Sequence, residues 1–469
     1  MNNAAVYNNS ESYTQKRTMG FFGNLSLSYK RMLYLNATGR VDKVSTMPRG
    51  NRTFFYPSVS VGFIFTELEP LKNEILTFGK IRASYAEVGM AGQYYPDYYT
   101  KGSFSGGFIS GVSIAYPIDG QMGYRRSTTV YDPNLKPQNT RSYELGPDLT
   151  FLDGLVSLSY TYSRQNVKDQ IFSIPLPRST GASSYYTNGG KVHTDAHELS
   201  LTINPIRRKN INWDMTFNFS KINNFVDELA EGVSSIQLGG YTSPNVRAMA
   251  GEKYPVVWGS CFKRDDKGNI VITEEGMPVA GGEGVIARVS PDFTLGFNTS
   301  LTVYKARLSA TFDWHKGGQI LAGTNGELDY YGVSKQSGID RDRGYAESTG
   351  VIQTGTDSNG NPIYSDVQTI QIPADKIEKF YTSRSSIWES RVSDNDFVKL
   401  REISLAYPVF KSNWMEVNVS LFARNILLWS KVKNIDPETS QGNGNMSGAM
   451  ERFSLPQTSS YGLGLNFKF

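Results

Sequence analysis

The last nine residues of the chain, Tyr461-Gly462-Leu463-Gly464-Leu465-Asn466-Phe467-Lys468-Phe469, decide the fold. Large apolar side chains occupy every second position, and glycine or polar residues occupy the positions between them. Successive side chains of a β-strand point to opposite faces of the sheet, so this stretch has one apolar and one polar face. Because a helix would scatter the same residues around a cylinder, the pattern predicts a β-strand with a different environment on each side.

The same alternation recurs along the whole chain and predicts an all-β fold. It gives roughly thirteen strands of about the length that a tilted strand needs to cross a bilayer. The predicted strands lie near residues 14–30, 32–47, 53–66, 75–92, 142–153, 155–172, 188–205, 211–229, 292–304, 306–322, 396–410, 415–430 and 460–469.

The connections between these strands alternate between short and long. The short ones are 30–32, 67–74, 153–154, 205–210, 304–305 and 411–414, and the long ones are 93–141, 173–187, 230–291, 323–395 and 431–459. The brief connection 48–52 is the exception. Short turns at one rim and long loops at the other are typical of a transmembrane antiparallel outer-membrane β-barrel, whose long loops are extracellular. The final strand then ends at the periplasmic side, where Phe469 resembles the terminal aromatic residue of an outer-membrane assembly signal.

Composition excludes several other classes of protein. The chain has 469 residues, 13% aromatic residues, one cysteine and a formal charge of +4. Disordered chains lack aromatic residues, disulfide scaffolds need paired cysteines, and a nucleic-acid partner needs a concentrated basic patch. No stretch approaches the ~18 consecutive apolar residues of a membrane helix. The polar beginning of the chain lacks the basic and apolar regions of a signal peptide.

Several short blocks of sequence carry a family resemblance. They are Tyr34–Asp42 (YLNATGRVD), Tyr56–Gly62 (YPSVSVG), Lys80–Gly89 (KIRASYAEVG), Pro133–Lys136 with Tyr143–Gly146, Asp396–Tyr407 (DFVKLREISLAY), and Ala423–Leu427 with Asp436–Glu438 (DPE). Together and in this order they resemble the C-terminal half of the SusC/RagA family of TonB-dependent outer-membrane transporters from Bacteroidetes. One departure is Lys136-Pro137-Gln138, where that family usually has Lys-Trp-Glu.

The resemblance implies a barrel of about 22 strands with a plugged lumen, of which about nine strands and the plug lie outside this sequence. Residues 1–13 are then the remnant of an extracellular loop, and residues 14–469 are part of the barrel. The implied function is TonB-energised import of glycans or peptides. The implied partners are a chain or region that supplies the plug and remaining strands, a SusD-like surface lipoprotein, TonB, and membrane lipid or lipopolysaccharide. An unclosed sheet would expose unpaired backbone groups to hydrocarbon.

Aromatic residues in the predicted extracellular loops are the candidates for binding a substrate or a partner. Exposed aromatic rings offer a flat apolar face with a polar edge, which suits stacking on sugars or packing on a protein. The alternative is that they pack the loops against one another. These residues are Tyr94, Tyr95, Tyr98, Tyr99, Tyr185, Tyr186, Trp258, Tyr330 and Tyr331. On the polar face of the strand near 306–322, Arg307, Asp313 and His315 are predicted to line the lumen.

Metal and catalytic sites find little support in the sequence. His193 and His197 share a strand face but are separated by ~13 Å of rise, too far for one zinc ion without a bend. The runs beginning at Asp265 and Asp357 look like calcium loops, yet their spacing fits tight β-hairpin turns better. A loop-bound calcium ion is possible, but no cofactor is predicted. We find no catalytic triad, and we do not expect an enzyme.

Three alternatives to an active importer remain open from the residues alone. A passive porin would share the barrel without a plug. An outer-membrane adhesin or secretion-associated scaffold would use the same long loops for protein contacts. A soluble, secreted carbohydrate-binding β-protein would show the same alternation of apolar and polar residues around a packed core.

Overall fold

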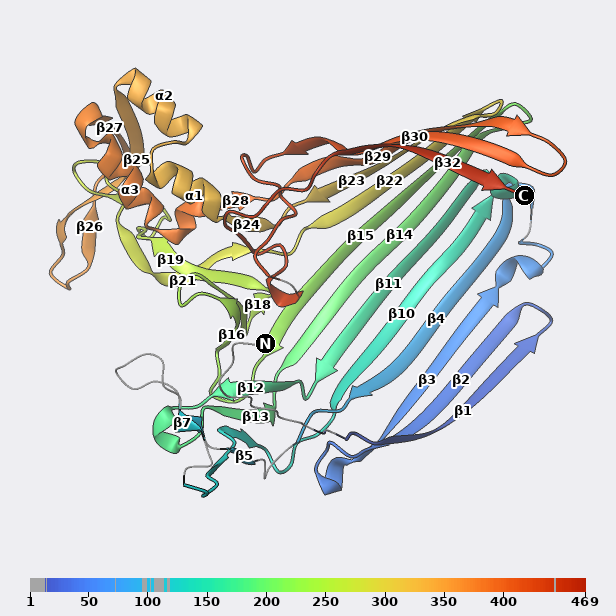
Figure 1. Ribbon diagram of the computed structural model, residues 1–469, viewed down its shortest axis with the longest axis horizontal. Coiled ribbons are helices and arrows are strands. Elements are labelled where there is room, and N and C mark those ends of the chain that lie inside the picture. The colour runs from blue at the N-terminus through green and yellow to red at the C-terminus, as the bar shows by residue number, and fades with distance from the viewer. Residues whose placement is uncertain are drawn as a thin grey trace.

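The computed structural model describes Tyr13 and residues 15–71, 73–94, 99–101, 103–104, 114–115, 119–442 and 444–469. Its main feature is a curved wall of long antiparallel strands, and a lobe of loops stands at one end of these strands (Figure 1). The wall strands are β1 (Thr18–Tyr29), β2 (Leu33–Val44), β3 (Thr53–Ile64), β4 (Leu76–Met90), β10 (Gln138–Phe151), β11 (Val156–Lys168), β14 (Lys191–Arg208), β15 (Ile211–Glu228), β22 (Phe293–Val303), β23 (Ala306–Lys316), β29 (Phe397–Lys411), β30 (Glu416–Ser430) and β32 (Ser460–Lys468).

Each wall strand pairs with the wall strands that precede and follow it along the chain, and a short strand, β18 (Glu252–Lys253), also pairs with β15. The predicted strands are therefore confirmed, with small differences at their ends. The largest difference is at 306–322, where β23 ends at Lys316 because Gly317 and Gly318 adopt φ values of +77° and +74°. Only glycine takes up such a conformation readily. Within the described residues, β1 pairs only with β2 and β32 only with β30, so the wall is an open sheet.

The register places apolar residues in rows across the wall. One row joins Trp213, Leu301, Leu308, Leu405, Leu421 and Leu463, each paired with the next. Leu421 and Leu463 are 57% and 63% exposed, which is the reverse of what a water-soluble protein does with leucine. An outward apolar band of this kind is the surface that a barrel presents to lipid.

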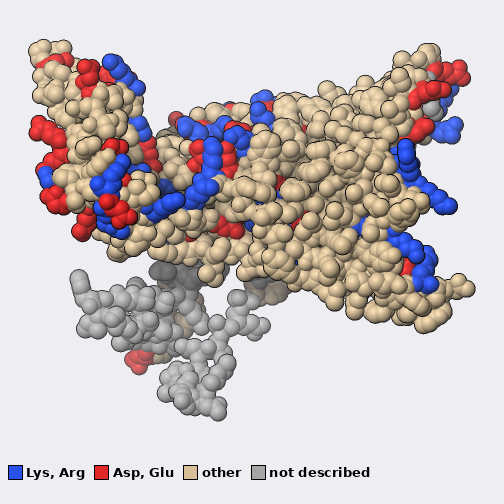
Figure 2. Space-filling view, turned by 90° about the horizontal axis from the view of Figure 1, so that it is seen from above, with Lys and Arg blue, Asp and Glu red and all other residues tan. Residues whose placement is uncertain are grey.

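Charged side chains gather at the two ends of the strands and leave a broad uncharged surface between them (Figure 2). At the end away from the lobe, the turns are tight: Lys30 and Arg31 have φ values of 48° and 53°, and Tyr304 has 54°. The short turns therefore lie at one rim and the long loops at the other, as the sequence predicts.

The loop lobe is formed by residues 230–291, 323–395 and 431–459. Its strands are β16 (Ser235–Gly240), β17 (Asn245–Met249), β19 (Val256–Phe262), β20 (Val271–Ile272), β21 (Ala280–Arg288), β25 (Tyr345–Thr356), β26 (Pro362–Tyr364), β27 (Gln368–Pro373), β28 (Val392–Asp394) and β31 (Met450–Glu451), joined by β24 (Gln319–Ala322). Its helices are α1 (Gly323–Tyr330), α2 (Lys335–Arg343) and α3 (Ile377–Ser385). Among the described residues, no helix is long and apolar enough to cross a membrane.

The connections 93–141 and 173–187 contain short strands, and single 3-10 turns occur at several places along the described chain. The strands are β5 (Tyr99–Lys101), β6 (Ser103–Phe104), β7 (Ile114–Ala115), β8 (Tyr124–Arg126), β9 (Thr129–Tyr131), β12 (Ile171–Pro175) and β13 (Ser184–Asn188). The 3-10 turns are Arg49–Asn51, Phe65–Glu67, Leu152–Gly154, Arg178–Thr180, Ala374–Lys376, Trp388–Arg391 and Gly444–Met446.

Most of the buried apolar residues of the described chain lie in the loop lobe, not in the wall. One cluster joins the three loops of the lobe. Val246, Val257 and Ala287 of residues 230–291 pack with Trp388 of residues 323–395 and with Met450 of residues 431–459. A second cluster joins Met277 of the first loop to Ile372, Ile377, Phe380 and Tyr381 of the second. The three loops of the lobe are thus one folded unit, held by cores of its own.

Candidate functional site

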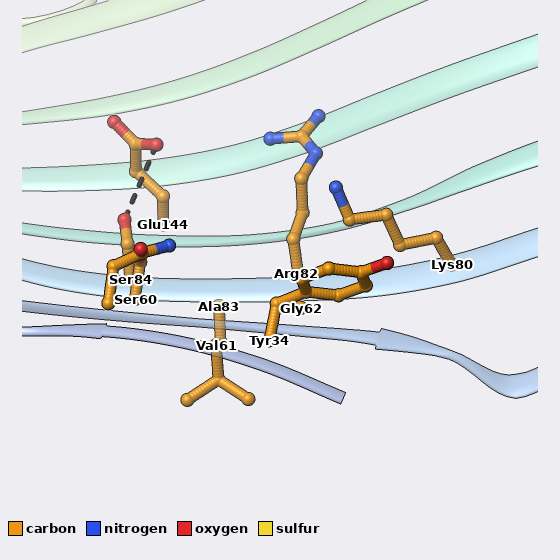
Figure 3. A pocket seen from close by; sticks show the side chains of 10 residues that line it. Tyr34, Ser60, Val61, Gly62, Lys80, Arg82, Ala83, Ser84 and Glu144 are labelled. Carbon is orange, nitrogen blue, oxygen red and sulfur yellow. Dashed lines mark hydrogen bonds between the residues drawn. The ribbon is translucent and has the colours of Figure 1, made fainter. Parts of the chain in front are cut away.

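The polar face of the wall carries a hollow of about 360 Å³ formed by β2, β3, β4 and β10. Lys80, Arg82 and Glu144 project into it from one side of the sheet, and Val61 points to the other side (Figure 3). Polar and apolar side chains lie on opposite sides of the sheet because polar residues occupy every second position of each strand. The hollow is lined by Tyr34, Asn36, Ser60, Val61, Gly62, Lys80, Arg82, Ala83, Ser84 and Glu144.

Arg82 organises the neighbouring polar side chains across three strands. Its guanidinium forms an ion pair with Asp148, with 3.2 Å between Nε and Oδ2, and donates hydrogen bonds to Thr161 and Ser159. Ser159 in turn donates to Asp148 at 2.7 Å. Lys80 has no hydrogen bond or ion pair with another described residue, so its ammonium group is available to a solute beside this face.

An ionic cluster, buried at Lys399 and Asp436 and partly exposed elsewhere, joins the loop lobe to the wall. We call it the anchor cluster: Asp313, Lys399, Arg401, Asp436 and Glu438. Lys399, which is 2% exposed, donates to Glu438 at 2.8 Å and lies 3.6 Å from Asp436. Arg401 bonds Glu438 with two nitrogens and Asp313 with Nε at 2.5 Å. Burial alone would raise the pKa of Glu438, but hydrogen bonds from Arg401 and Lys399 hold it below its usual value.

Four residues of the anchor cluster belong to two of the sequence blocks that carry the family resemblance. Lys399 and Arg401 belong to the block Asp396–Tyr407, and Asp436 and Glu438 belong to the DPE block. Two basic residues at alternate positions of a strand point to one face, and two acidic residues separated by proline follow in the next loop. Their charges are complementary, but the two blocks are more than thirty residues apart, and no local pattern in the sequence shows that they meet.

The three residues predicted to line the lumen lie on one face of β23, as their alternate spacing requires. Asp313 belongs to the anchor cluster. Arg307 donates to Ser300 at 2.8 Å, and His315 makes a 2.9 Å contact through Nδ1 with the carbonyl of Asn395 while stacking on Phe397. All three are therefore engaged with the protein itself, and contact with a permeating solute stays a prediction.

Among the described residues, the predicted aromatic side chains fall into separate groups. Tyr94 and Tyr186 both contact Tyr131, with ring centroids 6.1 Å and 5.5 Å apart. Tyr131, Tyr185 and Tyr186 belong to a small sheet formed by β12, β13 and β9. Tyr185 is half-buried there, and burial raises its pKa. Tyr99 belongs to β5, whereas Tyr95 and Tyr98 lie outside the described residues.

The three predicted aromatic residues of the loop lobe differ in how much of each side chain is exposed to solvent. Trp258 donates from Nε1 to Glu283 at 2.9 Å, and the Arg247 guanidinium covers its ring at 4.7 Å. Tyr330 and Tyr331 pack edge to face, yet Tyr331 remains 72% exposed. Tyr331 is thus the residue of this set that presents the largest free ring to a partner.

The two aspartate-led runs form matching hairpin turns. Asp265 accepts hydrogen bonds from the backbone of Lys267 and Asn269, and Asp357 does the same with Asn359 and Asn361. These bonds lower the pKa of both carboxyl groups, led at Asp265 by the Asn269 side chain and at Asp357 by the Asn361 backbone. The carboxylates face their own turns. Within the described residues, no group of three His, Cys, Asp or Glu side chains could hold a metal ion.

His193, His197 and Phe469 were also named in the sequence analysis, and the two histidines form hydrogen bonds within the protein. His193 pairs with Asp227 at 2.8 Å, and His197 with the Tyr160 hydroxyl at 2.8 Å, so the two imidazoles have different partners. Phe469 follows β32 and is 87% exposed. Its role in assembly stays a prediction.

The antiparallel sheet, its outward apolar rows and its long loops at one rim are the features of a membrane β-barrel wall. Comparison with known proteins leads to the same class. Residues 1–350 match the family described as "TonB dependent receptor-like, beta-barrel". The TonB-dependent receptor P26 of Formosa agariphila is 27% identical over 97% of this chain and 46% of its own length. The TonB-dependent receptor SusC of Bacteroides thetaiotaomicron is 24% identical over 47% of this chain and 22% of its own length.

Among solved structures, the RagAB peptide importer in its closed-closed state has a similar fold, with a TM-score of 0.69 and 17% identity over 96% of this chain and 47% of that chain. The chain therefore belongs to the TonB-dependent receptor-like β-barrel family of the outer membrane, and its resemblance to SusC and RagA is confirmed. That family consists of receptors and transporters and not of enzymes. The chain spans about half the length of the curated relatives that match nearly all of it.

Proposed function

We propose that this chain is the barrel wall and loop lobe of an outer-membrane nutrient importer of the SusC/RagA kind, energised through TonB. The observation that carries the proposal is the wall itself: its outward face is apolar, and its polar face holds Lys80, Arg82 and Glu144 in an open hollow. Such a wall separates lipid from a hydrated path. The substrate would be a glycan or a peptide, and the structurally similar RagAB is a peptide importer.

The loop lobe supports a second part of the proposal, which is a lipoprotein of the SusD type that covers the loops. The lobe has its own apolar cores and is fastened to β29 through the anchor cluster, so it can present a fixed surface to a lid. Exposed aromatic residues suit that contact, because one ring buries a large area at low entropic cost. Tyr331 is the described residue that fits this role best.

Uptake by whole cells tests the proposal. The gene is deleted and the full-length gene is returned, and labelled oligosaccharides and oligopeptides are offered with and without a protonophore. We expect deletion to abolish uptake of one substrate class and the protonophore to abolish it in complemented cells. Uptake that persists with the protonophore would indicate a passive porin, and unchanged uptake after deletion would contradict import altogether.

Purification of the complemented protein tests the partner separately. A complex extracted in mild detergent should contain a lipoprotein in equal amount, identified by mass spectrometry. Tyr331→Ala should weaken that association, whereas Tyr304→Ala, an equally exposed tyrosine in a turn at the opposite rim, should leave it unchanged. Purification of the barrel without any lipoprotein would contradict a lid and favour a scaffold.

A further inference from the structure

A hollow of about 580 Å³ lies on the apolar side of the wall, at the loop end of β23, β29 and β30. Its floor is a row of apolar residues in register: Trp314 pairs with Val398, and Val398 pairs with Trp429. Trp314 and Trp429 are 40% and 55% exposed. The backbones at Trp314 and Trp429 are two strand spacings apart, which is roughly 10 Å.

The rows on either side of this floor differ sharply in polarity. Toward the middle of the strands, the next outward row is Phe312, Leu400 and Leu427, which is also apolar. Toward the loops, the next outward positions are Lys316, Asp396 and Lys431, joined by ion pairs of 2.5 Å and 3.2 Å at Asp396. The tryptophan row therefore marks the boundary between hydrocarbon and polar headgroups, where indole rings concentrate in membrane proteins.

The polar edge of the hollow carries an excess of positive charge. Lys316, Lys431 and Lys433 face two acidic groups, Asp394 and Asp396, which leaves a net charge of +1. The Lys431 side chain is 57% exposed although it touches both aspartates. Lys433 has no acidic partner among the described residues and donates only to the carbonyl of Ser430. Two ammonium groups thus stand above an apolar floor with donor capacity to spare.

We propose that this hollow binds a phosphate-bearing glycolipid of the outer leaflet, with its acyl chains on Trp314 and Trp429 and its phosphate on Lys431 and Lys433. The width of the floor, three strands, suits a lipid with several acyl chains. The lysines supply point charges for the phosphate. The site rests on the outer-membrane location of the family, and it is independent of whether the barrel transports anything.

Lipid binding to the full-length protein in detergent tests the site by native mass spectrometry. The probes are lipid A, the same lipid A with its phosphates removed, and phosphatidylglycerol. A double variant, Lys431→Ala with Lys433→Ala, should bind lipid A more weakly by on the order of fivefold per lysine removed. The matched control is Lys209→Ala with Lys305→Ala, two exposed lysines in turns at the opposite rim, which should bind like the wild type.

Three other outcomes of the lipid-binding experiment would overturn the proposed site or its occupant. Equal binding of lipid A by the wild type and by the Lys431/Lys433 variant, while both keep the same heat-modifiable migration in gels, overturns the site. Equal binding of intact and dephosphorylated lipid A shows that phosphate is not recognised and also overturns it. If phosphatidylglycerol binds as tightly as lipid A with the same lysine dependence, the occupant is a phospholipid and the glycolipid assignment is wrong.

Discussion

The wall and the loop lobe use apolar residues in opposite ways. In the wall, Leu421 and Leu463 face outward and the backbone ladder between strands provides the order. In the lobe, Val257 and Ile372 are fully buried and side-chain packing provides the order. One chain therefore follows two solvation rules, because lipid surrounds one region and water surrounds the other. The effect of a substitution on stability should therefore depend on whether the residue faces lipid in the wall or is buried in the lobe.

The largest effect is expected where the two regions meet, in the anchor cluster. Lys399→Met leaves Glu438 and Asp436 without their buried cation, which costs roughly 3–5 kcal/mol when one partner of a buried pair is removed. Residues 431–459 should then be cut rapidly by protease, while the wall keeps its heat-modifiable migration. Lys305→Met, in an exposed turn, should change neither readout. Equal protease resistance in both variants would mean that the cluster does not hold the lobe.

A charge on the apolar face should cost somewhat less but act on the wall alone. Leu421→Arg places a cation near the middle of β30, which costs about 2–4 kcal/mol at the bilayer midplane. The free energy of folding into lipid vesicles, measured by denaturant titration, should fall by that amount. Tyr331→Arg on the exposed lobe should leave it unchanged. A tolerated arginine at 421 would contradict the lipid-facing assignment of this row.

The removal of one methyl group separates the two solvation rules more finely. Ile372→Val opens space in a closed core and should destabilise the lobe by ~1 kcal/mol. Ile81→Val, at an outward position that is 47% exposed, leaves no cavity because lipid fills the space, and its effect should be much smaller. Hydrogen exchange of lobe and wall amides measures both effects in one experiment. Similar destabilisation at the two positions would show that the wall is packed like a core.

The smallest effect is expected from pH at the rim. Burial opposes ionisation of Asp396, but hydrogen bonds from Lys316, Gly317 and Lys431 prevail and lower its pKa to about 2. A free aspartate titrates near 3.9. The stabilisation is therefore complete above about pH 4 and is lost as the pH falls through 2. Fluorescence of Trp314 and Trp429 should change in that window, and Asp396→Asn should remove the change.

The sequence predicts the wall well and the lobe poorly for a physical reason. Period two is a local signal, so each strand could be located from its own residues, apart from details such as the break at Gly317-Gly318. The lobe cores join residues far apart in the chain, such as Val246 and Met450, and no local pattern links them. The same holds for Lys399 and Glu438, whose blocks were visible while their contact was not. Among the aromatic loop residues, Tyr94, Tyr186 and Trp258 contact other side chains of the protein, whereas Tyr331 is largely exposed, and binding by these residues stays a prediction.

The shared core of the lobe has a consequence for the order of folding. Wall strands pair with their sequence neighbours, so the wall can grow hairpin by hairpin as the chain arrives. The loop of residues 230–291 cannot complete its core until Ala449 and Met450, about 160 residues further along the chain, are in place. We therefore expect the lobe to mature last, and its unfinished apolar surface to be the part that most needs protection during assembly.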